Sequence, residues 1–307
     1  MNKLDREARS KILHLLCEGN SIRAVTRLTG ASKNTVTKLL VDAGKSASLY
    51  QDEILRNLPC RRIQVDEIWS FCYAKQGNLP ADKRGQLGYG DLWTWTAICA
   101  DTKLVPSWFV GRRDASHAHA FISDLASRLA KRVQLTSDGH KAYLDAVDDV
   151  MHQNVDYAML IKIYGLPQEG TQHRYSPTEC IGARRQAILG NPDPDHISTS
   201  YVERHNLTMR MHMRRFTRLT NAFSKKAENH IAAVSLHFLY YNFVRIHQKL
   251  RMTPAMAAGI VHRLWDVEDM VLVLEKYEQK NSNCRVGPGN CRVGPGNCTP
   301  SLSQIRT

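Results

Sequence analysis

The stretch that decides the fold is RIQVDEIWSF, residues 62–71, in which polar and apolar side chains alternate and β-branched or aromatic residues are frequent. This alternation predicts a β-strand with two different faces. If the strand is regular, Val65 shares a face with Glu67, and Gln64 shares the other face with Asp66. Two adjacent carboxylates therefore point in opposite directions, and the pattern alone does not choose which of them would do chemistry.

Further elements of the same sheet follow along the chain. DLWTWTAICA, residues 91–100, alternates in the same way, and LVPSWFVG, residues 104–111, returns after a short turn, which predicts a hairpin. A helix follows whose apolar positions recur at helical spacing, namely Ala118, Phe121, Ile122, Leu125 and Leu129. RVQLTSDGHKAY, residues 132–143, predicts a further strand that ends at Asp138. The order strand, hairpin, helix, strand predicts a mixed α/β sheet.

The rest of this large domain, predicted over 61–279, is more varied. Loop signals such as LPQEG and GNPDPDH predict an insertion near 145–198, with irregular structure over 150–198. Two long helices are expected near 199–216 and 223–247, and Thr253-Pro254 caps and opens another.

The N-terminal part, residues 5–44, predicts a small helical module. SIRAVTRLTGASKNTVTKLL, residues 21–40, fits a helix-turn-helix, with Ser32 as the cap of the later helix and Gly44 as its stop. The following segment, 45–60, is expected to be a linker. In the DNA-binding interpretation the later helix enters the major groove. The side chains that would then face DNA are Lys33, Asn34, Thr35, Thr37 and Lys38. An ordinary three-helix packing unit is the alternative.

The charge balance points to a polyanionic partner. The 307 residues include 42 Lys plus Arg against 29 Asp plus Glu, which gives a net charge of +13 and a pI near 9.5. Nucleic acid is the commonest partner of such a chain. No apolar run is long enough to span a membrane, and the charged N-terminus lacks the apolar core of a signal peptide. We therefore expect a cytoplasmic protein.

The cysteines suggest no metal site in the folded part. Five of the eight lie far apart and form no C-x-x-C pair, so neither a zinc knuckle nor a disulfide framework is indicated. The other three belong to a tail in which the heptad NCRVGPG occurs twice, at 283–289 and 290–296. Gly-Pro-Gly and the lack of large apolar groups predict a disordered repeat tail over 280–307. Metal binding by cysteines spaced seven apart is the alternative.

Three carboxylates in separate parts of the chain stand out. Asp66 lies in the first strand, Asp138 at the end of a later strand, and Glu203 at the head of a basic helix. A single acid at a strand end usually caps a turn. Three acids in this order, behind a DNA-binding module, fit two-metal phosphoryl transfer, in which carboxylates hold two cations about 3.5–4 Å apart. Oxygen ligands suit Mg²⁺, and Mn²⁺ is a possible substitute.

A basic run follows Glu203. Arg210 lies seven residues later, which is two helical turns and therefore on the same face, and we expect this face to continue through Leu207 to Arg214. The two arginines would then hold phosphates of the DNA strand whose scissile phosphate lies at Glu203. A purely structural helix can carry the same pattern. His140 and His205 stand next to triad members, where proton transfer, DNA contact and a structural role are all open.

Taken together, VDEIWSF, TSDGHKAY and YVERHNLTMRMHMRRFTRLTNAFSKK resemble the insertion-sequence-one type of bacterial DDE transposase. YYNFVRIHQKLRMTPAMAAG resembles the segment that closes many transposase and integrase catalytic domains. The resemblance covers roughly residues 5–275. It implies an RNase H-like core, a mixed sheet flanked by helices, with Asp66, Asp138 and Glu203 as the metal-binding triad. The cysteine zinc motif that many relatives carry ahead of the helix-turn-helix is missing here, and the tail heptads are foreign to the family.

The activity implied by the resemblance is DNA transposition. Such an enzyme binds the terminal inverted repeats of its element, cleaves the ends and joins them to target DNA, and it works as a homo-oligomer on DNA at the bacterial nucleoid. A nuclease of the same core that only cuts is one alternative. A DNA-binding repressor derived from a transposase, without catalysis, is another.

Overall fold

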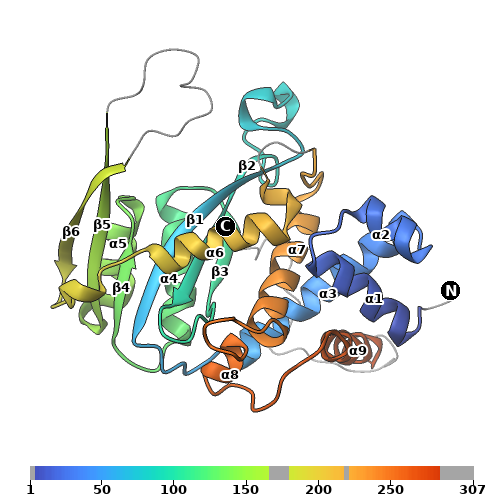
Figure 1. The fold of residues 1–307 in the computed structure, drawn as a ribbon. Helices are drawn as coiled ribbons and strands as arrows, with labels where there is room; N and C mark the ends of the chain where they lie inside the picture. The colour runs from blue at the N-terminus through green and yellow to red at the C-terminus, as the bar shows by residue number, and fades with distance from the viewer. Residues whose placement is uncertain (1–3, 166–179, 218–220, 284–307) are drawn as a thin grey trace, which may run out of the picture.

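The computed structural model describes residues 4–165, 180–217 and 221–283, and a six-stranded mixed sheet lies at its centre (Figure 1). The strands are β1 (Arg62–Cys72), β2 (Gly90–Cys99), β3 (Trp108–Gly111), β4 (Val133–Ser137), β5 (Val155–Tyr164) and β6 (Cys180–Leu189). Their order is β3-β2-β1-β4-β5-β6, with β1, β4 and β5 parallel and β2 and β6 antiparallel to their neighbours. This is an RNase H-like sheet with β6 added at one edge, and it confirms the predicted fold class.

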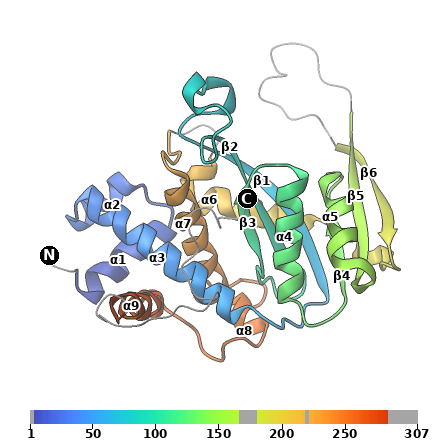
Figure 2. The same cartoon turned by 180° about the vertical axis from the view of Figure 1, so that it is seen from behind.

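Helices cover both faces of the sheet. They are α1 (Arg6–Cys17), α2 (Ile22–Thr29), α3 (Lys33–Ile54), α4 (Ala115–Arg128), α5 (Ala142–Met151), α6 (Ser200–His212), α7 (Ala227–Leu239), α8 (Pro254–Ala257) and α9 (Val267–Asn283). Figure 1 shows α6 crossing the near face of the sheet, and Figure 2 shows α4 and α5 on the opposite face. None of the helices in the described part of the chain is long and apolar enough to cross a bilayer.

The alternation in β1 divides the core in two. Ile63 and Val65 belong to the larger hydrophobic cluster, which includes the inner sides of α4 and α5 and continues into α1 to α3. Ile68, on the other face, belongs to a second cluster with Val202 and Met209 of α6. The strand therefore has the two faces that its sequence predicts, and Asp66 lies on the α6 side.

The prediction that Gly44 ends the third helix is wrong. Ser32 caps α3 as expected, but α3 continues through residues 45–54 of the predicted linker. Gly44 serves instead as a contact point, because a Cβ there would lie 2.5 Å from the Cα of Ala232 on α7. Further along α3, Gln51 donates from Nε2 to the carbonyl of Ser235, 3.2 Å away. The glycine thus permits close packing of two helices.

The prediction that residues 150–198 are irregular is also wrong for most of the described ones. They contain all of β5 and β6, and only the end of the segment, from Gly190 onward, is irregular as GNPDPDH predicts. Val155 and Tyr157 of β5 are fully buried and pair in parallel with β4, so β5 is an inner strand of the sheet. LPQEG lies outside the described residues. The repeat tail does so as well from residue 284 onward, and α9 occupies the chain up to Asn283.

Candidate active site

Two predicted acids meet where β1 and β4 diverge. The last pair joining the two strands is Gln64 with Thr136, so Asp66 lies just beyond it, and Asp138 follows the last residue of β4. Carboxylate oxygens of Asp66, Glu67 and Asp138 all lie within 4.8 Å of one another. Within the described residues, this is the one group of three or more metal-ligating side chains so close together.

The N-terminus of α6 is held by β1. The side chain of the N-cap residue, Thr199, makes no capping hydrogen bond. Instead Oε1 of Gln64 accepts from the backbone N–H groups of Tyr201 and Val202, at 2.8 and 3.1 Å. These amides would otherwise lack partners at a helix start. The strand that carries Asp66 therefore also anchors the helix that carries Glu203.

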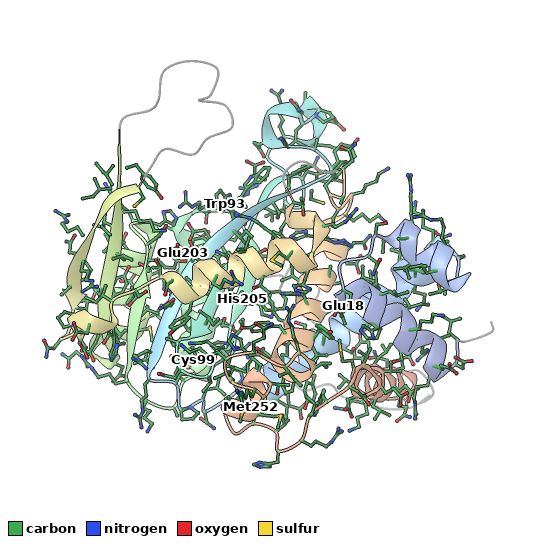
Figure 3. All side chains as sticks on the ribbon, viewed as in Figure 1. Glu18, Trp93, Cys99, Glu203, His205 and Met252 are labelled. Atoms are coloured by element: carbon green, nitrogen blue, oxygen red, sulfur yellow. The ribbon has the colours of Figure 1, made fainter. Side chains whose placement is uncertain are left out.

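A second tie lies one helical turn past Glu203. Asn206 donates from Nδ2 to Oδ2 of Asp66 at 2.8 Å. Glu203 lies between the two ties, at the end of α6 that crosses the sheet (Figure 3). Its charge contributes to the raised pKa of Asp66, although it is not part of the tight group of three. Acids from β1, β4 and α6 thus gather at one edge of the sheet.

Lys162 of β5 is a site residue that the sequence analysis missed. Its Nζ lies 2.7 Å from Oε1 of Glu203. Burial lowers the pKa of this ammonium. The hydrogen bond to Glu203 and the negative charge of Glu203 together outweigh burial, so the pKa of Lys162 is raised. The alternation of β5 was the available signal, and it was obscured by the loop residues that follow the strand.

The acids raise one another's pKa. Burial, and then the charges of Glu67 and Asp138, raise the pKa of Asp66 from 3.8 to about 7. Burial and the charge of Asp138 likewise raise the pKa of Glu67, against the opposing effect of Arg113. A crowded set of carboxylates is costly without a cation. Because all donors are oxygens, the set fits a hard divalent cation such as Mg²⁺.

The adjacent acids Asp66 and Glu67 have different neighbours. Glu67 is fully buried, and Arg113 donates from Nε to its Oε1 at 2.6 Å. The hydroxyl of Tyr143 donates to its other oxygen at 3.0 Å. Asp66 is half-buried and accepts from the backbone N–H of Glu67 and from Asn206. Both oxygens of Glu67 thus already have strong partners on the α5 side.

The two histidines next to Asp138 and Glu203 pack against aromatic rings. His140 packs against Trp95 with the two rings tilted and their centroids 5.8 Å apart. His205 is buried between Phe238 and Tyr241, at 5.6 and 4.5 Å. Burial lowers the pKa of both, that of His205 to about 3, so both rings are neutral near pH 7. His205 therefore faces away from any DNA that α6 would contact.

The predicted arginine face is shorter than expected. Arg210 lies half-buried in α6, but the helix ends at His212, and Arg214 begins a short 3₁₀ turn. The expected continuation of one helical face to Arg214 is therefore wrong. Met213 adopts an extended backbone because it and Phe216 turn into the core.

The predicted DNA-facing residues of α3 lie at its N-terminal end, far along the chain from the acids. Lys33, Asn34 and Lys38 are exposed, and Lys38 is ion-paired with Asp42. Thr35 is half-buried, and its backbone N–H is capped by the Ser32 hydroxyl. Figure 1 shows α1, α2 and this end of α3 on the side of the molecule away from β5 and β6.

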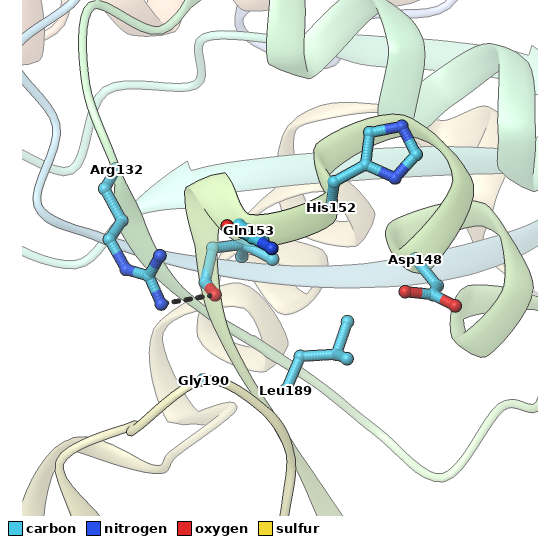
Figure 4. A pocket seen from close by; sticks show the side chains of 7 residues that line it. Arg132, Asp148, His152, Gln153, Leu189 and Gly190 are labelled. Atoms are coloured by element: carbon cyan, nitrogen blue, oxygen red, sulfur yellow. Dashed lines mark hydrogen bonds between the residues drawn. The ribbon is translucent and has the colours of Figure 1, made fainter.

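A cavity of about 530 Å³ lies at the other end of the strands from the acids (Figure 4). It is where β4 and β5 begin, whereas Asp138 follows the end of β4. Its lining residues are Arg132, Asp148, His152, Gln153, Val155, Leu189 and Gly190. Arg132 donates to the carbonyl of Val155 and pairs with Asp156. The cavity is therefore separate from the acidic group.

No protein-family model and no curated protein matches the sequence. The solved structures that resemble the chain include transposases. A piggyBac transposase synaptic complex with hairpin DNA aligns over 100% of this chain and 80% of that chain, at 10% identity and a TM-score of 0.41. The Mos1 strand transfer complex aligns over 78% of this chain and 79% of that chain, at 12% identity and a TM-score of 0.23. The Mos1 mariner paired-end complex with Mn aligns over 78% of this chain and 77% of that chain, at 12% identity and a TM-score of 0.25.

Proposed function

We propose that this protein is a DDE transposase of the insertion-sequence-one type, acting on DNA in the bacterial cytoplasm. The observation that carries the proposal is the gathering of acids from β1, β4 and α6 at one edge of an RNase H-like sheet. Asp66, Asp138 and Glu203 are the proposed metal ligands. Glu67 is left out because both of its oxygens already serve Arg113 and Tyr143.

Divalent metal ions, Mg²⁺ or Mn²⁺, supply activation of the attacking oxygen and stabilisation of the leaving one when bound. The chain's own residues position the reactants. The ties from Gln64 and Asn206 hold α6 against β1, so the three carboxylates keep their mutual placement. Arg210 would hold a phosphate of the bound strand, because it lies two turns along the face of Glu203.

The proposed reaction has two steps. The oxygen of water attacks phosphorus at the element end, the bond from phosphorus to the 3′ oxygen breaks, and a 3′ hydroxyl is released. That hydroxyl then attacks a phosphorus of target DNA and displaces the 3′ oxygen there. Each step exchanges one P–O bond for another, so catalysis comes from positioning and charge neutralisation.

End recognition is assigned to the N-terminal helices. The exposed Lys33 and Asn34 at the start of α3 suit base-edge and phosphate contacts in a major groove. Lys38 would exchange its ion pair with Asp42 for a DNA phosphate. The partner is the terminal inverted repeat of the element, and two such ends call for a homo-oligomer.

The test uses DNA from both flanks of the gene as substrate, with Mg²⁺ or Mn²⁺. Asp66→Asn, Asp138→Asn and Glu203→Gln should each abolish cleavage and leave end binding nearly intact. Asp145→Asn, an exposed acid on α5, is the matched control and should cleave normally. Near-normal cleavage by any of the three variants would remove that residue from the triad. A pre-cleaved end that is never joined to target DNA would instead indicate a cutting-only nuclease.

A further inference from the structure

Four aromatic side chains on one face of the sheet belong to neither hydrophobic core. They are Trp69, Phe71, Trp93 and Phe223, and all four are half-buried. Aromatic side chains each bury about 150–250 Å² when they pack fully, so they usually dominate a core. A group left at the surface marks an interaction site more often than a defect of packing.

The four side chains are contiguous. Trp69 and Trp93 lie directly opposite each other in the antiparallel pair of β1 and β2. Trp69 and Phe71 have ring centroids 5.6 Å apart, and Phe71 and Phe223 lie 5.0 Å apart. Phe223 reaches them because the next residue, Ser224, forms a β-bridge to Cys72 of β1, beyond the point where the pairing of β1 with β4 ends. We call these four residues the aromatic patch.

The patch is uncovered because β1 and β2 extend beyond the first residue of α4, so α4 does not cover this part of the strands. Trp95, two residues further along β2 on the same face, packs against Phe121 of α4 and Tyr143 of α5. Trp93 lies beyond the part of β2 that α4 and α5 cover, and it contacts the guanidinium of Arg113, just ahead of the start of α4. Figure 2 shows the β1–β2 hairpin continuing past the end of α4.

Cations stand over the patch. The guanidinium of Arg113 lies 4.8 Å from the ring centroid of Trp93, and Nζ of Lys75 lies 6.0 Å from that of Trp69. The carboxylates nearby already have partners, since Glu67 pairs with Arg113 and Asp91 accepts from the backbone N–H of Gln76. Flat rings flanked by cations suit nucleobases joined by phosphates.

The patch also continues the proposed active site. Glu67 and Trp69 are two residues apart on one face of β1, and Arg113 touches both Glu67 and Trp93. Asp66 lies on the opposite face of β1, but carboxylate oxygens of Asp66, Glu67 and Asp138 lie within 4.8 Å of one another at the edge where β1 and β4 diverge. A DNA strand that crosses this edge of the sheet would therefore have a phosphate at the acids and its next nucleotides at the tryptophans.

We propose that Trp69 and Trp93 form a stacking site for unpaired nucleobases of the DNA strand held at Asp66 and Asp138. This inference rests on the proposed function, and it adds that the DNA end is opened at the site. A second copy of the chain is a poorer occupant. Each of the four side chains offers about 150–250 Å² in all and is already partly buried. Together they therefore expose less than the roughly 800 Å² that a stable interface takes from each partner.

The experiment measures binding by the full chain in EDTA, so it does not depend on cleavage. The probe is a fluorescein-labelled oligothymidylate of about 15 nucleotides, close to the length that one binding site covers. Trp69→Ala and Trp93→Ala should each weaken its binding by about 5- to 150-fold, the range for loss of one stacked base. Trp69→Phe should restore most of the binding. Trp108→Ala, a half-buried tryptophan on β3 that stacks on Phe238, is the matched control.

A second substrate separates base stacking from general DNA affinity. Blunt duplex DNA presents few unpaired bases, so the Trp69→Ala and Trp93→Ala variants should bind it as the wild type does. Equal losses for duplex and single strand, or no loss for either, would overturn the proposal. So would a change from dimer to monomer in light scattering without DNA, because the patch would then join two copies. Cleavage by the triad variants would instead refute the transposase assignment and leave this measurement standing.

Discussion

Replacing Asp66 by Asn should stabilise the metal-free protein at alkaline pH, although it removes a proposed metal ligand. Burial and the charges of Glu67 and Asp138 raise the pKa of Asp66 to about 7 from its ordinary value of 3.8. At 1.36 kcal/mol per pH unit, that interval corresponds to about 4 kcal/mol. The amide keeps one acceptor oxygen but loses one of the two hydrogen bonds to Asp66, at a cost of about 1 kcal/mol. The expected net gain is therefore about 3 kcal/mol.

The pH dependence follows from the direction of the shift. The folded-state pKa of Asp66 lies above the unfolded one, so the unfolded chain gives up this proton first as pH rises. The wild type thus has its full stability at this site below about pH 4 and loses it as pH rises through about 7. Asp66→Asn escapes this loss. Its advantage should be largest at pH 8 and absent near pH 4.

Thermal unfolding in EDTA measures the effect. An unfolding entropy of about 2.1 cal/mol/K per residue gives about 0.6 kcal/mol per degree for this chain, so 3 kcal/mol raises Tm by about 5 °C. Excess Mn²⁺ should raise the Tm of the wild type more than that of Asp66→Asn. Asp82→Asn, an exposed acid, is the control and should leave Tm unchanged. A variant no more stable than the wild type at pH 8 in EDTA would refute the electrostatic argument.

Three further outcomes are expected. Gly44→Ala should lower the free energy of unfolding by about 1–3 kcal/mol in urea, because its Cβ would collide with the α7 backbone at Ala232. Lys162→Met should tighten Mn²⁺ binding in calorimetry, by up to about fivefold, since a half-exposed ion pair with Glu203 contributes about 1 kcal/mol or less. Lys38→Ala should flatten the salt dependence of end binding by about one unit of slope, read by fluorescence anisotropy, if it contacts a phosphate.

Each of these variants has a matched control. Gly77→Ala meets open space and should be neutral. Lys131→Met, an exposed lysine away from the acids, should leave Mn²⁺ affinity unchanged. Lys11→Ala on α1 should leave the salt slope unchanged. Weaker Mn²⁺ binding by Lys162→Met would contradict competition between the ammonium and the cation, and an unchanged slope for Lys38→Ala would rule out its phosphate contact.

Local periodicity was enough to predict the strands and helices whose two faces have different surroundings, at least one of them buried. The alternation of RIQVDEIWSF matches β1 from Arg62, and the helical spacing around Phe121 matches α4. Elements defined by distant partners were missed. Gly44 has the local signature of a helix stop, and only its neighbour Ala232 on α7 explains why the helix continues.

The acidic group divides in the same way. The sequence pattern predicts Asp138 at the end of a strand, whereas Asp66 lies within β1 and only the family resemblance favours it over Glu67. The pattern does not predict Lys162, because its strand, β5, falls in the segment that the loop signals mark as an insertion. The role of Glu67 was equally out of reach, since its partners Arg113 and Tyr143 lie 46 and 76 residues further along the chain.

The placement of Glu203 depends on two polar side chains, Gln64 and Asn206, that a pattern of apolar residues ignores. Gln64 precedes Asp66 by two residues on one face of β1, and its side-chain oxygen Oε1 accepts from the backbone N–H of Val202. Asn206 lies four residues beyond Val202, on the same side of α6, and donates to Asp66. Two contacts on one strand and two on one helix fix both the position and the rotation of α6. A shift of β1 by one residue along its axis would turn Gln64 and Asp66 to the opposite face of the sheet, because successive strand residues face opposite ways. Both hydrogen bonds to α6 would then be lost.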